Sequence, residues 1–96
     1  MSDVVKKAVV ALNQKLEGEG IDGTAQFNIE NEGSMYLDST GAHEGEADAD
    51  VTFTADADTL QEIFEGSLNP TTAFMSGRLT IDGDMGMAMK LAATLA

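Results

Sequence analysis

The period of the apolar residues changes along the chain, and this change limits the fold more than any other feature of the sequence. Residues 4–16 repeat apolar side chains every three or four positions, as one face of an amphipathic helix does. Residues 24–30 and 49–55 instead alternate apolar with polar side chains, which is typical of strands with one buried face. Residues 56–65 return to the helical spacing. Separate helical and strand segments of this kind predict an α+β domain.

Residues that cap helices set the ends of several expected elements. Asp56 is placed to cap the helix that follows it, and Gly66 is placed to end that helix. Asn69 and Pro70 supply a cap and a first-turn residue for a second, shorter helix. The expected order is helix 4–16, strands 24–30, 35–38 and 49–55, helices 57–65 and 70–76, strand 78–82 and helix 85–95.

The connections between the first three expected strands are short and polar. Residues 31–33 end in a glycine and form a turn, while residues 39–48 have the composition of a polar loop. Short connections of this kind predict that the three strands form an antiparallel meander. The sequence contains no internal repeat and no long linker, so we expect residues 1–96 to form a single domain.

The charge of the chain limits its partners. The sequence has 17 Asp and Glu against 5 Lys and Arg, a net charge of −12. Such a surface repels phosphates, so we expect no nucleic-acid partner. Residues 1–16 carry a net charge of +2 and residues 17–96 one of −14. We therefore expect any transient membrane contact to involve the basic first helix, although its apolar stripe favours packing against the domain.

The chain offers little for catalysis or metal binding. It has no cysteine and one histidine, His43, which excludes disulfides, thiol catalysis and the usual zinc sites. An EF-hand that began at Asp48 would need glycine and glutamate where the chain has Phe53 and Thr59. No nucleophile lies in a recognisable pattern with a base. We expect a non-enzymatic protein with no catalytic residues, metal or cofactor.

Neither a membrane-spanning run of apolar residues nor a secretory signal is present in the sequence. We therefore expect a cytoplasmic protein, either a monomer or a weak dimer.

Four methionines, at positions 75, 85, 87 and 89, lie close together near the end of the sequence. They fit two interpretations, ordinary core filling or an adaptable apolar surface that binds a partner of irregular shape. Together with the helix at 57–65, this region carries more apolar side chains than a thin layer over four strands needs. A pocket between the helices and the sheet would use the excess.

Residues 69–91 resemble the sterol carrier protein type 2 family, whose segment reads roughly N-P-x-x-A-F-M-x-G-K-L-K-I-x-G-[ND]-M-x-x-A-M-K-L. The matching residues are Asn69, Pro70, Ala73, Phe74, Met75, Gly77, Leu79, Ile81, Gly83, Met85, Ala88, Met89, Lys90 and Leu91. Residues 49–53, Ala-Asp-Val-Thr-Phe, resemble a strand of the same family. The match fixes many non-interchangeable residues in one register and covers about residues 27–91.

The resemblance implies a twisted, mainly antiparallel sheet covered on one side by helices, with an apolar tunnel between them. The family's strand order is 3-2-1-4-5, and its first and fourth strands are parallel. Longer members add a fifth strand after the last helix. Since this sequence ends at Ala96, we expect the order 3-2-1-4, with the fifth strand missing and the element order α-β-β-β-α-α-β-α.

The resemblance also implies non-enzymatic binding, and transfer, of a fatty acid, a fatty acyl group or a sterol-like lipid. The net charge disfavours acyl-CoA and anionic lipids, and therefore favours a single-chain or compact neutral lipid. An accessory module that presents lipid-like intermediates to a partner enzyme is the alternative. The expected lining residues are Phe53, Leu60, Ile63, Phe64, Phe74, Met75, Ile81, Met85, Met89 and Leu95.

Overall fold

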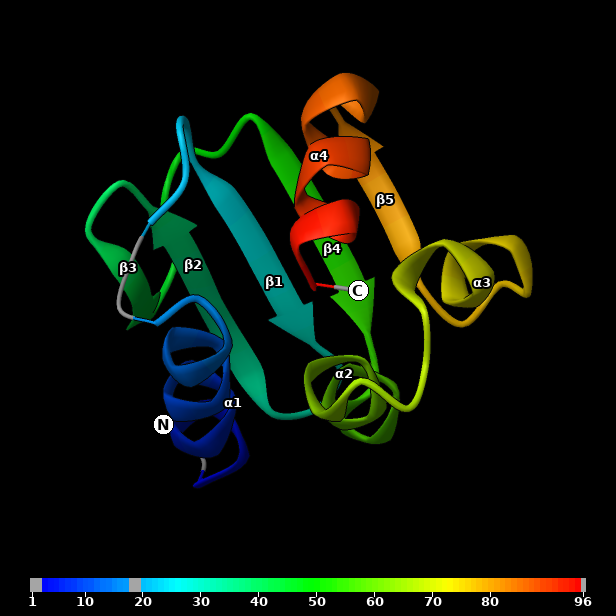
Figure 1. The fold of residues 1–96 in the computed structure, drawn as a ribbon. Coiled ribbons are helices and arrows are strands. Elements are labelled where there is room, and N and C mark those ends of the chain that lie inside the picture. Colours follow the sequence, from blue (N-terminus) through cyan, green and yellow to red (C-terminus); the bar gives the residue numbers. More distant parts are fainter. Residues whose placement is uncertain (1–2, 18–19, 96) are drawn as a thin grey trace.

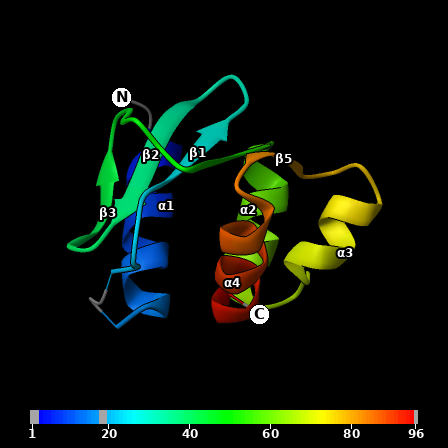
Figure 2. The same cartoon turned by 90° about the horizontal axis from the view of Figure 1, so that it is seen from above.

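The computed structural model describes residues 3–17 and 20–95, in which helices lie on one face of a five-stranded sheet (Figure 1). The elements are α1 (Asp3–Lys15), β1 (Ala25–Ile29), β2 (Gly33–Asp38), β3 (Gly41–Glu44), β4 (Val51–Ala55), α2 (Ala57–Glu65), α3 (Pro70–Met75), β5 (Thr80–Gly83) and α4 (Met85–Leu95). Figure 2 shows α1, α2 and α4 beneath the sheet, with α3 beyond its β5 edge. No helix among these residues is long and apolar enough to cross a bilayer.

The strands lie in the order β3-β2-β1-β4-β5. β1 and β4 are parallel, with Phe27 opposite Phe53, and the other neighbouring pairs are antiparallel. The α+β class and the helices on one face of the sheet are therefore confirmed. The parallel neighbour of β1 is β4, which the sequence pattern counted as the third strand, whereas the expected fourth strand, 78–82, corresponds to β5 and pairs with β4. The prediction that the fifth strand is missing is wrong, because β3 completes the order 3-2-1-4-5.

β3 lies within residues 39–48, which the sequence pattern predicted to be a loop. Its four residues, Gly-Ala-His-Glu, include no large apolar side chain, so no alternation marks them as a strand. β3 pairs with β2, and this places Ala42 opposite Leu37 and His43 opposite Tyr36. The predicted three-strand meander is also wrong, since β4 lies beside β1 instead of following β2.

One face of the sheet supplies the floor of the core. Along β1, Ala25, Phe27 and Ile29 are buried against the helices and alternate with half-buried polar residues. The ring of Phe27 stacks on Phe53 with centroids 5.0 Å apart, and it meets Phe64 of α2 edge-on at 6.2 Å. This contact joins two parallel strands to a helix, and so fixes α2 over the centre of the sheet.

The predicted helix caps are confirmed. The Asp56 carboxylate accepts a hydrogen bond from the backbone N–H of Thr59 at 2.7 Å, and Gly66 ends α2 with φ +83°. Hydrogen bonding by the side chain and backbone of Thr59 lowers the pKa of Asp56. At α3, the Asn69 side chain accepts from the Thr71 N–H at 2.8 Å.

α1 is held at the β3 edge of the sheet by a polar contact and an apolar one. The Asn13 carboxamide accepts a hydrogen bond from the Ala42 N–H at 2.8 Å and donates one to the Ala42 carbonyl at 3.1 Å. This side chain thus takes the place that the backbone of a further strand would occupy. The apolar stripe of α1, with Val5 and Leu12, is buried on the domain, and Leu16 directly after the helix is buried as well.

Candidate functional site

A cavity of about 690 Å³ opens between α1 and α2, above the end of β1. We call it the α1–α2 cavity. Its apolar lining consists of Val4, Ala8 and Ala11 of α1, Ile29 of β1, and Ala57, Leu60 and Phe64 of α2. The volume lies within the range of about 300–1,000 Å³ that is usual for small-molecule sites.

The side chains of α1 explain why this space stays open. Ala8 and Ala11 face α2, and their single methyl groups leave room that larger residues would fill. The larger residue Leu12 is fully buried on the same helix and anchors it. α1 therefore packs tightly along one stripe and loosely along its flank.

Charged side chains on the cavity wall include two cations, Lys7 and Lys15, and two acids, Asp58 and Glu65. Within residues 3–17 and 20–95, Lys7 and Lys15 have no acidic partner within 4.0 Å. By contrast, Arg78 forms an ion pair with Glu62. Lys7 and Lys15 thus bring two ammonium groups to the cavity wall, where an anionic headgroup could bind.

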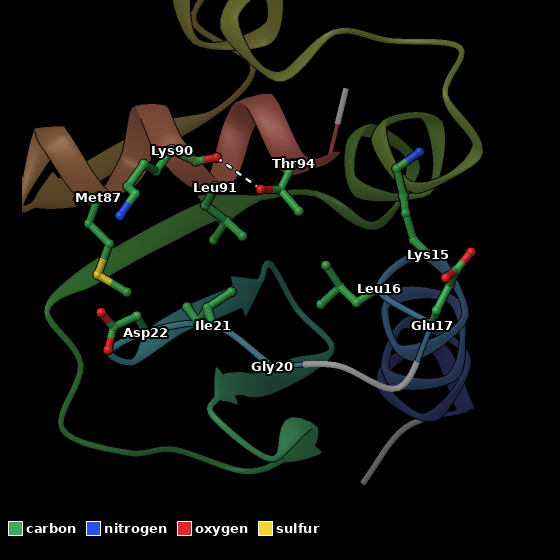
Figure 3. A pocket seen from close by; sticks show the side chains of 10 residues that line it. All are labelled: Lys15, Leu16, Glu17, Gly20, Ile21, Asp22, Met87, Lys90, Leu91 and Thr94. Carbon is green, nitrogen blue, oxygen red and sulfur yellow. Dashed lines mark hydrogen bonds between the residues drawn. The ribbon is translucent and has the colours of Figure 1, made fainter.

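A second cavity, of about 470 Å³, lies between the C-terminal end of α1 and α4 (Figure 3). We call it the α1–α4 cavity. The side chains of Leu16, Ile21 and Leu91 point into it from three different segments, while Lys15 and Lys90 lie at its edge. Lys15 therefore lines both cavities.

The segment that leads into β1 shapes the α1–α4 cavity, and backbone contacts hold it in place. The Ile21 N–H donates to the Asp38 carbonyl at 3.0 Å, and the Thr24 N–H donates to the Asp50 carboxylate at 3.2 Å. Between them, Gly23 adopts φ +110°, and a Cβ there would lie 2.9 Å from the Met87 methyl group. Glycine at this position lets the segment pass under Met87, which also lines the cavity.

The residues expected to line a lipid tunnel fall into three groups. Leu60 and Phe64 line the α1–α2 cavity. Phe53, Ile63 and Leu95 are buried in the core, and Ile81 is half-buried on the helix side of β5, opposite Phe53. The remaining residues are exposed, at 37% for Phe74, 81% for Met75, 43% for Met85 and 42% for Met89.

Sequence reasoning did not single out the contributions of α1 and of the segment before β1. Val4, Ala8 and Ala11 flank the buried stripe of α1, and Ile21 lies outside any regular element. The available signal was the presence of small residues beside a buried stripe. The motif that carried the family resemblance lies in the other half of the sequence and does not reach them.

His43, the single histidine, takes part in a hydrogen-bond network at the β2–β3 turn. The Thr40 hydroxyl bridges the Asp38 carboxylate at 2.6 Å and the His43 ring at 2.8 Å, across the tight β2–β3 turn. Hydrogen bonding by Thr40 lowers the pKa of Asp38. No group of three or more His, Asp or Glu side chains that could hold a metal occurs in the described part of the chain.

Two curated proteins that are similar in sequence to this chain carry the same name. The chain is 46% identical over 77 residues to hydroxysteroid dehydrogenase-like protein 2 of Danio rerio, covering 72% of this chain and 19% of that protein. The corresponding Xenopus tropicalis protein is 37% identical over 93 residues, covering 88% of this chain and 22% of that one. The chain thus spans about a fifth of the length of these curated relatives.

Among solved structures, the fold matches Aedes aegypti sterol carrier protein 2 in complex with palmitate. The TM-score is 0.77, with 19% identity and coverage of 100% of this chain and 97% of that one, and this likeness shows the fold. The model of the SCP-2 sterol transfer family matches residues 7–96, which confirms the resemblance carried by residues 69–91. The chain therefore belongs to the SCP-2 sterol transfer family.

Proposed function

We propose that this domain is a non-enzymatic lipid carrier that binds the hydrocarbon chain of a fatty acid in the α1–α2 cavity. The observation that carries the proposal is the combination of a largely apolar interior with two lysines at its wall, neither of which has an acidic partner among residues 3–17 and 20–95. Membership of a sterol transfer family supports a lipid ligand, and the palmitate bound to the Aedes aegypti protein supports a single-chain one.

In this proposal, Lys15 holds the ligand carboxylate. Lys15 lines both cavities. A ligand whose tail fills the α1–α2 cavity can therefore place its carboxylate beside Lys15, the residue that the two cavities share. The net charge of −12 repels anions at a distance, but salt screens charges that are more than about 10 Å apart at 0.1 M. One carboxylate beside an ammonium group is compatible with this field, whereas the several phosphate charges of acyl-CoA are disfavoured.

Transfer of apolar surface out of water drives the binding. Each buried CH₂ group contributes about 0.8 kcal/mol, which corresponds to roughly a fourfold change in affinity. Affinity should therefore rise by about this factor for each carbon added to a saturated fatty acid, until the cavity is full. Leu60 and Phe64, the expected lining residues that lie at this cavity, would contact the tail.

The test is a titration of delipidated protein with saturated fatty acids of increasing length. Ala8→Phe and Ala11→Phe each place a ring in the α1–α2 cavity and should weaken binding at least tenfold, about 1.4 kcal/mol. Val10→Phe is the matched control, because Val10 lies on the same helix but is 55% exposed and lines neither cavity. Equal affinity of all three variants and the wild type would place the ligand elsewhere.

A second candidate function is that of an accessory module for a partner enzyme. The observation that favours it is that the curated relatives are about five times as long as the region they share with this chain, and are named as dehydrogenase-like proteins. Here the domain would present its lipid to an enzyme. Affinity purification from the native host tests this, since a dehydrogenase retained at equal stoichiometry supports the module and retention of lipid alone contradicts it.

A further inference from the structure

Four large apolar side chains are exposed on two helices that contact each other, and neither proposed cavity uses them. Phe74 and Met75 lie on α3, and Met85 and Met89 lie on α4. We call this set the α3–α4 patch. Met75 is the most exposed of the four, at 81%. None of the four lines the α1–α2 or the α1–α4 cavity.

The patch lies in the part of the chain that carries the least charge. Residues 17–65 contain fourteen acidic side chains and neither Lys nor Arg. In residues 66–96, Arg78 and Lys90 balance Asp82 and Asp84. The whole of residues 66–77 is uncharged, and Lys90 is the only charged residue of α4. The two helices that carry the four exposed side chains thus contain no acidic residue.

We propose that the α3–α4 patch is the surface by which the domain docks transiently on a zwitterionic lipid bilayer. Docking on this side brings to the interface two helices that carry no acidic side chain. Unbranched methionine side chains adapt to an irregular acyl surface.

The size of the patch favours a bilayer over a second copy of the chain. With about 200 Å² for a fully exposed large side chain, the four exposed fractions amount to roughly 400 Å². Stable protein interfaces bury about 800 Å² on each partner. A bilayer needs no matching second surface, so a small apolar patch suffices for weak and reversible docking.

α1 is the competing surface, because it carries the three lysines of residues 1–16. Its apolar stripe, however, is turned into the domain, which leaves Val10 as its exposed large apolar residue in the described structure. Docking through α1 would therefore depend on charge, increase with anionic lipid and weaken with salt. Docking through the α3–α4 patch would show none of these three dependences.

The experiment is flotation of the protein with phosphatidylcholine vesicles, with and without added phosphatidylserine. The wild type should bind phosphatidylcholine vesicles, and added salt should not release it. The double variant Met75→Glu/Met89→Glu should bind about tenfold more weakly or worse, because a carboxylate resists entry into the acyl layer. Val10→Glu is the matched control, an equally acidic change on the exposed side of α1, and should bind as the wild type does.

Two results would overturn the proposal. One is that Val10→Glu abolishes binding while the double variant binds normally, which would assign docking to α1. The other is that sedimentation shows a dimer that the double variant dissociates, which would assign the patch to a second copy of the chain. Fatty-acid titration of the same double variant keeps this proposal separate from carrier function. Failure of the wild type to bind fatty acid would count against the carrier and leave the vesicle result standing.

Discussion

α1 and α4 both cover the same face of the sheet, and both line the α1–α4 cavity, yet they divide their apolar residues differently. α1 buries Val5 and Leu12 in the core, and its exposed side carries Lys6, Lys7 and one large apolar residue, Val10. α4 buries Ala88, Leu91, Ala92 and Leu95 but leaves Met85 and Met89 exposed. The comparison shows that apolar spacing identifies the buried side of α1, whereas in α4 the apolar residues extend beyond the buried side and leave an apolar surface exposed.

The two helices also differ in how they are attached. α1 is joined to the edge of the sheet by the Asn13–Ala42 pair of hydrogen bonds in addition to its buried leucines. α4 begins directly after Asp84, whose carboxylate accepts a hydrogen bond from the Met87 N–H at 3.1 Å, and the helix contacts β4, β5 and α3. α1 is therefore the wall that a specific polar contact fixes, and α4 the wall held by packing.

The largest effect should come from the buried stripe of α1. Leu12 is fully buried, so Leu12→Ala should lower the free energy of unfolding by about 2–5 kcal/mol. Chemical denaturation measures this loss. Val10→Ala, on the exposed side of the same helix, is the control and should cost less than about 0.5 kcal/mol. Equal losses in the two variants would mean that α1 is not anchored by this stripe.

Removal of the polar attachment should have the next largest effect. Asn13→Ala leaves the N–H and carbonyl of Ala42 without their partners and should cost about 1–3 kcal/mol. Gln14→Ala changes the neighbouring, exposed amide and should be close to neutral. If Asn13→Ala lowered the thermal unfolding temperature no more than Gln14→Ala does, the polar contact would not fix α1, and the contrast between α1 and α4 would be wrong.

The Asp56 cap of α2, the other wall of the α1–α2 cavity, should contribute to stability in a pH-dependent way. The hydrogen bonds of Asn13 should not depend on pH. At neutral pH, Asp56→Ala should cost about 1 kcal/mol through loss of the helix cap. Because the pKa of Asp56 is lowered in the folded state, its contribution is present above the unfolded pKa of about 3.9 and is lost as pH falls through the lowered value. The difference between variant and wild type should therefore shrink below about pH 4.

Denaturation of both proteins over a range of pH checks this prediction. A difference that stayed constant into strong acid would show that the carboxylate charge plays no part in the cap. The neutral amide of Asn13 provides the internal comparison, since the cost of Asn13→Ala should not change over the same range.

The smallest effect should come from the exposed side of α4. Met89→Ser should change the free energy of unfolding by less than about 0.5 kcal/mol, since the side chain is 42% exposed. Leu91→Ala, two residues further along the same helix, should cost about 2–5 kcal/mol. A large loss for Met89→Ser in thermal unfolding would mean that the α3–α4 patch is part of the core.

Local signals predicted much of this structure. Asp56, Gly66 and Asn69 marked helix ends correctly, because a cap is an interaction between near neighbours in sequence. β3 was missed because its partner strand, and not its own composition, makes Gly41–Glu44 a strand. Which helix face stays uncovered depends on tertiary packing, so spacing alone could not show that Met75 and Met89 are exposed.

The residues of the candidate site could also be predicted only where the signal was local. Leu60 and Phe64 were predicted because they share one face of α2. Ala8 and Ala11 were not, since a small residue shows an open space only when the neighbour that fails to fill it is known. Lys15 could not be placed from the sequence, because the two cavities it lines are formed by segments that are distant in the chain.

The central claim is that a fatty acid lies between α1 and α2 while the α3–α4 patch stays free for a membrane. The most direct test is an NMR titration of isotopically labelled, delipidated protein with palmitate. We predict that the methyl signals of Ala8, Ala11 and Leu60 shift with the ligand, while those of Met75 and Met89 do not. Shifts confined to Met75 and Met89, with Ala8, Ala11 and Leu60 unchanged, would contradict the account.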